Sequence, residues 1–162
     1  MNTIHRYIPA LAVTISLLVL LTALGFQYLG DIRPCKLCLW QRWPHALVII
    51  PLIGWIARPA SFWLLVGGLL MLIGSLLGGY HWGVENQWWM GLASCSGSQL
   101  NAGELVIDFL SPVSVPRCDE VVWSFLGLSM AGWNMIISLA LAFLWLYAFS
   151  QKYSTNCKIS DQ

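Results

Sequence analysis

The sequence predicts an all-α membrane protein that folds as a bundle of four transmembrane helices. Of its 162 residues, 58% are hydrophobic and only 9% are charged, whereas soluble globular domains carry about 25% charged residues. Uncharged stretches long enough to cross a bilayer, which takes about 20 apolar residues, also recur along the chain. The formal net charge of +1 and the lack of a basic run give no indication of a nucleic-acid partner.

We expect a single membrane domain over residues 1–162, with spans at about residues 8–29, 39–57, 61–81 and 130–150. The first span carries Pro9 near its start, where the missing N–H costs nothing. Its apolar run exceeds that of a signal peptide, so we interpret it as a retained helix. The second uncharged window, residues 43–57, is too short to cross a bilayer. Its helix must therefore begin near Leu37 or Leu39, which draws Arg42 to the membrane boundary.

The third span is expected at the centre of the bundle. It contains Gly74-x-x-x-Gly78 and Gly79-x-x-x-Gly83, and small residues at this spacing let helix backbones approach closely.

Four spans place both termini on one side, with a tail at about residues 151–162, and leave loops at about 30–38 and 82–125 on the other. Lysine and arginine divide four to four between the sides, so the positive-inside rule does not orient the chain. Four of the five cysteines fall in the two loops: Cys35, Cys38, Cys95 and Cys118. Because disulfides persist outside the cytosol, we predict periplasmic loops and cytoplasmic termini.

Two further segments carry smaller predictions. Residues 105–110 of the long loop are expected to form a short helix lying along the membrane interface. Cys157 in the predicted tail is interpreted as an incidental free thiol.

The Cys35-x-x-Cys38 pair is the strongest candidate for chemistry. A disulfide between these residues closes too small a ring to stabilise the fold much, and a zinc site would need a second such pair or a His-x3-5-His motif. We therefore predict a redox pair and no metal. A helix N-terminus here would lower the pKa of a cysteine thiol. Arg42 follows Cys38 by one helical turn, where it either snorkels to headgroups or holds the polar head of a membrane-borne oxidant.

Cys95 and Cys118 are 23 positions apart and allow two interpretations. They form either a structural staple for the loop or a pair that exchanges disulfides. The surroundings of Cys95 (Ser94, Ser96 and Gly97) predict an exposed, flexible position, which favours exchange. His81, at the end of the third span, is interpreted either as a structural residue or as a hydrogen-bond or proton donor to a quinone.

These features, with the segment from Cys118 to Met130, resemble the disulfide bond formation protein B (DsbB) family over nearly the whole chain. The resemblance implies a thiol:quinone oxidoreductase of the bacterial inner membrane, with ubiquinone or menaquinone as acceptor and a DsbA-like thioredoxin-fold protein as partner. It implies that Cys95 forms the mixed disulfide with that partner, that Cys118 exchanges with Cys35, and that Cys38 faces the quinone beside Arg42. His81 is expected to be a further residue that contacts the quinone. We expect a monomer embedded in membrane lipid.

Three alternatives stay open. A vitamin K epoxide reductase-like protein has the same chemistry, but its pair belongs with its last helix, whereas here the pair precedes the second. A variant of the same family could serve one dedicated substrate. A soft-metal carrier or an assembly factor is less favoured, because the predicted span interiors offer few metal ligands.

Overall fold

The computed structural model of the protein describes residues 4–92, 95 and 117–160, except for the side chains of residues 4–6 and 154–160. The helix predicted at residues 105–110 and the side chain of Cys157 therefore lie outside the described part of the chain.

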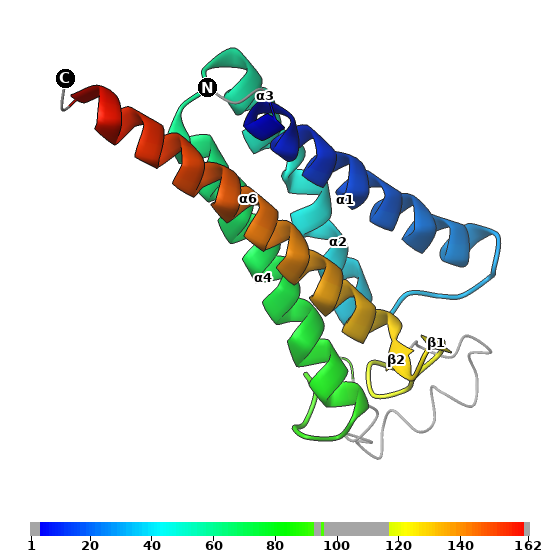
Figure 1. Ribbon diagram of the computed structural model, residues 1–162. Helices are drawn as coiled ribbons and strands as arrows, with labels where there is room; N and C mark the ends of the chain where they lie inside the picture. Colours follow the sequence, from blue (N-terminus) through cyan, green and yellow to red (C-terminus); the bar gives the residue numbers. More distant parts are fainter. Residues whose placement is uncertain (1–3, 93–94, 96–116, 161–162) are drawn as a thin grey trace, which may run out of the picture.

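The described chain is mostly helical. Its elements are α1 (Ile4–Tyr28), α2 (Lys36–Leu47), α3 (Ile49–Ala57), α4 (Ser61–Glu85), β1 (Ser124–Phe125), β2 (Leu128–Ser129) and α6 (Met130–Ser160). Within α1, α4 and α6, three segments are long and apolar enough to cross a membrane: Tyr7–Tyr28, Ser61–Glu85 and Met130–Tyr153. The start of α1, the α3–α4 turn and the end of α6 lie at one end of the bundle (Figure 1). The architecture agrees with the predicted all-α membrane protein.

The predicted second span is not one continuous helix. It is covered by α2 and α3, of 12 and 9 residues, which follow one another with a break at Val48 (Figure 1). Pro51 explains the break, since proline has no N–H for the carbonyl of Leu47 and its ring clashes with that carbonyl. The helix begins at Lys36, close to the predicted start near Leu37 or Leu39.

The third predicted span is α4, which packs against α6, α2 and α3 and most extensively against α6. Its glycines make the close approach to α6 possible. A Cβ at Gly78 would lie 2.8 Å from the backbone nitrogen of Met135, and Gly67 lies against the ring of the fully buried Trp145. Larger residues at these positions would push the two helices apart.

Two features after the long loop differ from the prediction. A hairpin forms from β1 and β2, with Leu126 and Gly127 at positive φ in its turn. A leucine at positive φ is uncommon, so the Leu-Gly pair carries no hairpin signal of the Asn-Gly kind. The last helix also continues to Ser160 rather than ending near residue 150.

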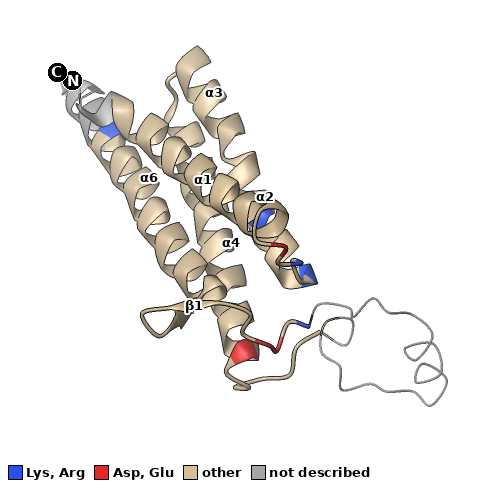
Figure 2. Ribbon diagram, turned by 90° about the vertical axis from the view of Figure 1, so that its right-hand side faces the viewer, with Lys and Arg blue, Asp and Glu red and all other residues tan. Residues whose placement is uncertain are grey.

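Most of the charged residues coloured on the ribbon lie toward the end of the bundle opposite to the start of α1 (Figure 2). This end carries the α1–α2 connection, the end of α4 and the segment 117–120. The four cysteines Cys35, Cys38, Cys95 and Cys118 belong to the same end.

Candidate active site

The first turn of α2 organises the Cys35–Cys38 pair. Cys35 is the N-cap of α2, and its Sγ accepts a hydrogen bond from the backbone N–H of Cys38 at 3.2 Å. Its extended backbone, with φ −72° and ψ 171°, is the conformation that a capping residue adopts. The two sulfurs are 2.8 Å apart, share a hydrogen bond, and both belong to free thiols. The predicted position of the pair at a helix N-terminus is therefore confirmed.

In this geometry the two thiols have different pKa values. The hydrogen bond from the Cys38 side chain, helped by His81 and by the backbone N–H of Cys38, lowers the pKa of the Cys35 thiol to about 4 although burial opposes the shift. The same side-chain bond, with burial, raises the pKa of Cys38. Cys35 is thus the thiolate of the reduced pair, and Cys38 keeps its proton.

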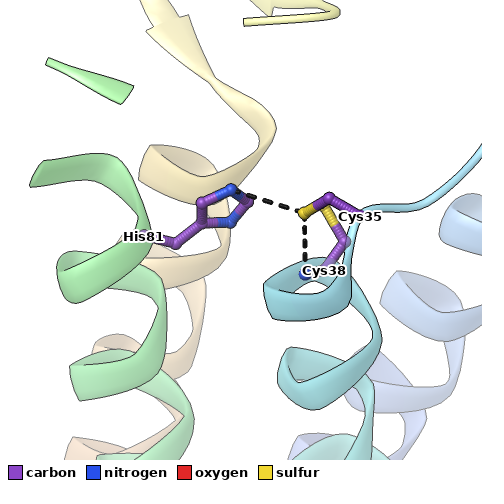
Figure 3. Close-up of side chains that lie close together, drawn as sticks. All are labelled: Cys35, Cys38 and His81. Carbon is purple, nitrogen blue, oxygen red and sulfur yellow. Dashed lines mark hydrogen bonds between the residues drawn. The ribbon is translucent and has the colours of Figure 1, made fainter. Parts of the chain in front are cut away.

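His81 points from α4 toward Cys35 (Figure 3). Its Nε2 lies 3.6 Å from Cys35 Sγ, and its Nδ1 lies 2.7 Å from Nε2 of the buried Gln41. An amide nitrogen can only donate, so Nδ1 accepts and the ring proton is on Nε2. Gln41 therefore orients the N–H of His81 toward the Cys35 sulfur.

Glu85 extends this polar group one turn further along α4. Its Oε1 lies 3.8 Å from His81 Nε2, and its other oxygen accepts a hydrogen bond from Ser129 in β2. Ser129 Oγ in turn accepts the backbone N–H of Gly132 at 3.2 Å. The hairpin is thereby fastened to the helix that carries His81.

A cavity of about 500 Å³ opens beside the pair. Its wall is largely apolar, with side chains from α1, α2 and α6 and from the segment after Cys118. The polar and charged residues on it include Cys35, Cys38, Gln41, Arg42, His45, His81, Glu85 and Asn134. A cavity of this size with a few convergent polar groups is typical of a small-molecule site.

Arg42 lies on the cavity wall with Cys38, as the spacing of the two residues predicted. Its guanidinium donates to Gln27 Oε1 at 2.6 Å and to the carbonyl of Ala23 at 3.4 Å, so α1 holds it in place. Among the described residues, no carboxylate forms an ion pair with it. The remaining donors of Arg42 are therefore available to an oxygen-bearing ligand in the cavity.

Cys95 and Cys118 form a disulfide, and the N–H of Cys118 donates to the carbonyl of Cys95 at 2.8 Å. Both are buried in one cluster with Cys35, at 6% and 0% exposure. The expectation of an exposed Cys95 is therefore wrong for its side chain, because Leu37 and Val84 belong to the same cluster and exclude water from the disulfide.

The ligand atoms of Cys35, Cys38 and His81 all lie within 4.8 Å of one another. Two sulfurs and an imidazole nitrogen are soft-metal ligands, so this group could hold a metal ion when the pair is reduced. The sequence did not indicate this, because His81 is 46 residues from Cys35 and fits no metal-binding spacing.

The structure thus brings Cys35, Cys38, Arg42 and His81 to one cavity. It also adds Gln41 and Glu85, for which the sequence predicted no role. A signal for Glu85 was present, since it follows His81 by one helical turn. Gln41 had none, because its partner lies 40 positions away.

Known proteins resemble this chain along most of its length. A family model described as disulfide bond formation protein DsbB matches residues 5–148. The disulfide bond formation protein B of Alkalilimnicola ehrlichii is 33% identical over 150 residues, covering 86% of this chain and 90% of the relative. That of Azoarcus sp. is 32% identical over 135 residues, covering 76% and 80%. An uncharacterized protein of Rickettsia prowazekii is 28% identical over 155 residues, covering 91% and 90%. No solved structure matches the chain.

Proposed function

Because the chain belongs to the disulfide bond formation protein B family, we propose that it reoxidises a periplasmic DsbA-like dithiol and passes the two electrons to a membrane quinone. Its membership of this family means that the chain is a membrane protein that takes part in disulfide-bond formation. The acceptor, the partner and the role of each cysteine are our proposal.

One observation carries the proposal: both thiols of the Cys35–Cys38 pair lie on the wall of a largely apolar cavity of about 500 Å³ that also holds Arg42. A lipid-soluble quinone has an apolar ring and two oxygens that accept hydrogen bonds. The apolar side chains of α1 and α6 suit the ring, and the free donors of Arg42 suit one oxygen.

Electrons enter through the Cys95–Cys118 disulfide. A thiolate of the partner attacks Cys95 Sγ, which breaks the disulfide and releases the Cys118 thiolate. Cys118 then attacks Cys35 in the Cys35–Cys38 disulfide and releases Cys38. The second partner thiol attacks the first partner sulfur in its disulfide with Cys95 and frees Cys95. Cys95 then attacks Cys118 in the Cys118–Cys35 disulfide, which restores the Cys95–Cys118 bond and releases Cys35. The partner leaves as a disulfide, and Cys35 and Cys38 are both reduced.

Electrons leave through the cavity, where a quinone acts as the two-electron oxidant. Cys35 and Cys38 return to a disulfide while the quinone gains two electrons and two protons to become a quinol. The reduced pair holds one proton, on Cys38, because the Cys35 thiol has a pKa of about 4. The second proton has to come from another donor, and the nearest side-chain N–H is that of His81, whose Nε2 lies 3.6 Å from Cys35 Sγ.

We further propose that residues 39–57, which α2 and α3 cover, form a fourth span of a single membrane domain, with both termini in the cytoplasm and the four cysteines on the periplasmic side. Support comes from the continuity of α2 and α3, which have only Val48 between them and together reach from Lys36 to Ala57. The oxidising conditions that a stable Cys95–Cys118 disulfide needs support the periplasmic side.

The test is an assay with purified protein, a reduced thioredoxin-fold dithiol and a soluble quinone analogue. We expect quinone reduction by the wild type and none above background in the serine variants of Cys35, Cys38, Cys95 and Cys118. The matched control is Cys157→Ser, which should keep wild-type activity. Full activity in any of the four variants would remove that cysteine from the pathway.

A further inference from the structure

A second polar group lies on the wall of the same cavity, away from the cysteines. It is built from His45 of α2, which is only 1% exposed, and from Asn134 and Ser138 of α6. His45 Nε2 lies 3.0 Å from Asn134 Oδ1 and 3.2 Å from Ser138 Oγ. His45 and Asn134 both line the cavity.

Two buried atoms of this group have no hydrogen-bond partner in the described chain: His45 Nδ1 and Asn134 Nδ2. An unpaired polar atom in an apolar interior costs about 1–3 kcal/mol, so such atoms are usually paired or belong to a site. Because His45 Nε2 donates to Asn134 Oδ1, Nδ1 is an acceptor, whereas Asn134 Nδ2 is a donor. The group therefore presents one acceptor and one donor without partners.

The position of His45 on α2 relates it to the redox pair. Cys38, Arg42 and His45 follow one another at intervals of four and three residues, so they share one face of the helix, and all three line the cavity. His45 lies seven positions after Cys38, which is a rise of about 10 Å along the helix. A quinone ring with its two oxygens and one hydrogen bond to each oxygen spans a similar length.

We propose that His45 and Asn134 form a subsite for the quinone oxygen remote from the cysteines. This inference rests on the proposed function and deepens it. A carbonyl oxygen there accepts a hydrogen bond from Asn134 Nδ2. The hydroxyl of the quinol makes that contact and also donates to His45 Nδ1. The subsite thus fixes the ring at both ends, with Arg42 near the cysteines and the His45–Asn134 pair beyond.

The alternative is that the group only ties α2 to α6, as polar side chains do between membrane helices. A purely structural tie would alter stability without altering affinity for quinone. The Ser75→Ala variant is a suitable control, because Ser75 makes a buried polar contact between α4 and α6, to the carbonyl of Met135 at 3.1 Å, and does not line the cavity.

The experiment measures KM for a short-chain ubiquinone analogue at saturating dithiol, together with direct binding of the analogue by quenching of tryptophan fluorescence. We expect Asn134→Leu and His45→Phe each to raise the quinone KM by roughly tenfold and to weaken binding equally, with the dithiol KM unchanged. Ser75→Ala should leave both quinone values as in the wild type. If Asn134→Leu does not fold, Asn134→Ala takes its place.

Folded variants that bind the analogue as the wild type does would overturn the subsite and leave the proposed function intact. Equal increases in both KM values would overturn it as well, because they indicate a general loss of structure. A wild type that oxidises the dithiol without binding or reducing the analogue would overturn the proposed function and the subsite together.

Discussion

The two cysteine pairs of this protein are supported in different ways. Cys35 and Cys38 lie in one helical turn, as free thiols on the wall of a cavity. Cys95 and Cys118 are 23 positions apart and joined, and neither is among the described residues that line the cavity. The helix fixes the first pair, whereas the second pair depends on a buried cluster that it shares with Cys35.

Under the proposed function, this difference suits the two pairs to separate tasks. A hydrogen bond from Cys38, the contact with His81 and a helix N-terminus stabilise a thiolate at Cys35, which suits a pair that donates electrons. The Cys95–Cys118 disulfide is buried in one cluster with Cys35, so the proposed exchange between the pairs needs no water. In the proposed reaction, by contrast, a partner thiol has to uncover Cys95 before it can attack.

The largest expected effect is the loss of quinone reduction in cysteine variants, which should differ between the two pairs when the reductant is changed. With a protein dithiol, both Cys38→Ser and Cys118→Ser should reduce quinone reduction to background. With a small thiol that can reach Cys35 directly, Cys118→Ser should recover activity and Cys38→Ser should not. The measurement is the rate of quinone loss with each reductant.

Cys157→Ser controls for the removal of a thiol outside both pairs. Recovery of Cys38→Ser with the small thiol would show that one cysteine of the first pair suffices, and the division of tasks would then be wrong.

The next effect is on the pH dependence of alkylation. A pKa of about 4 means that Cys35 stays a thiolate as the pH falls from 8 to 5, so its alkylation rate should change little over this range. An ordinary thiol, with a pKa of about 8.5, loses roughly tenfold in rate per pH unit below that value. Alkylation of the reduced protein, followed by mass spectrometry of each cysteine, measures the profile.

Cys38 provides the internal comparison, because its pKa is raised and its rate should fall steeply over the same range. Gln41→Leu frees the orientation of His81 and should raise the apparent pKa of Cys35, because the His81 hydrogen bond that lowers it is weakened. A Cys35 rate that falls tenfold per unit from pH 8 in the wild type would contradict the stabilised thiolate.

A smaller effect is expected at Arg42. Arg42→Ala should raise the quinone KM by roughly tenfold through loss of a charge-assisted hydrogen bond, and should change the dithiol KM little. Steady-state kinetics with each substrate varied in turn provide the two values. Arg42→Lys, which keeps the charge, should fall between wild type and alanine, and equal changes in both KM values would count against a quinone contact.

The smallest effect on the chemistry is expected from packing. Gly78→Ala places a methyl group 2.8 Å from the backbone of Met135 and should destabilise the α4–α6 contact by about 1–3 kcal/mol. Both cysteine pairs should then lose activity in parallel on heating. Gly25→Ala is the matched control, since nothing lies within 4 Å of its Cβ, and thermal unfolding in detergent compares the two. Equal midpoints would contradict the close approach.

Particular residues show how far the sequence predicted the molecule. The apolar segments of α1, α4 and α6 and the helix start at Cys35 follow from composition and spacing, which are local properties. Pro51 is a local signal for the break at Val48, but the uncharged window, taken by itself, predicts one continuous helix. The bond between Gln41 and His81 and the burial of Cys95 had none, because each depends on residues that meet only when the helices pack.

The central claim is that Cys35 and Cys38 alone deliver electrons to the quinone. A variant in which Cys95, Cys118 and Cys157 are all replaced by serine can be reduced, freed of reductant and mixed with one equivalent of quinone analogue. We predict one quinol formed and two thiols lost per protein, by absorbance and thiol titration. If no quinol forms, or if as much forms when Cys38 is also serine, the claim is wrong.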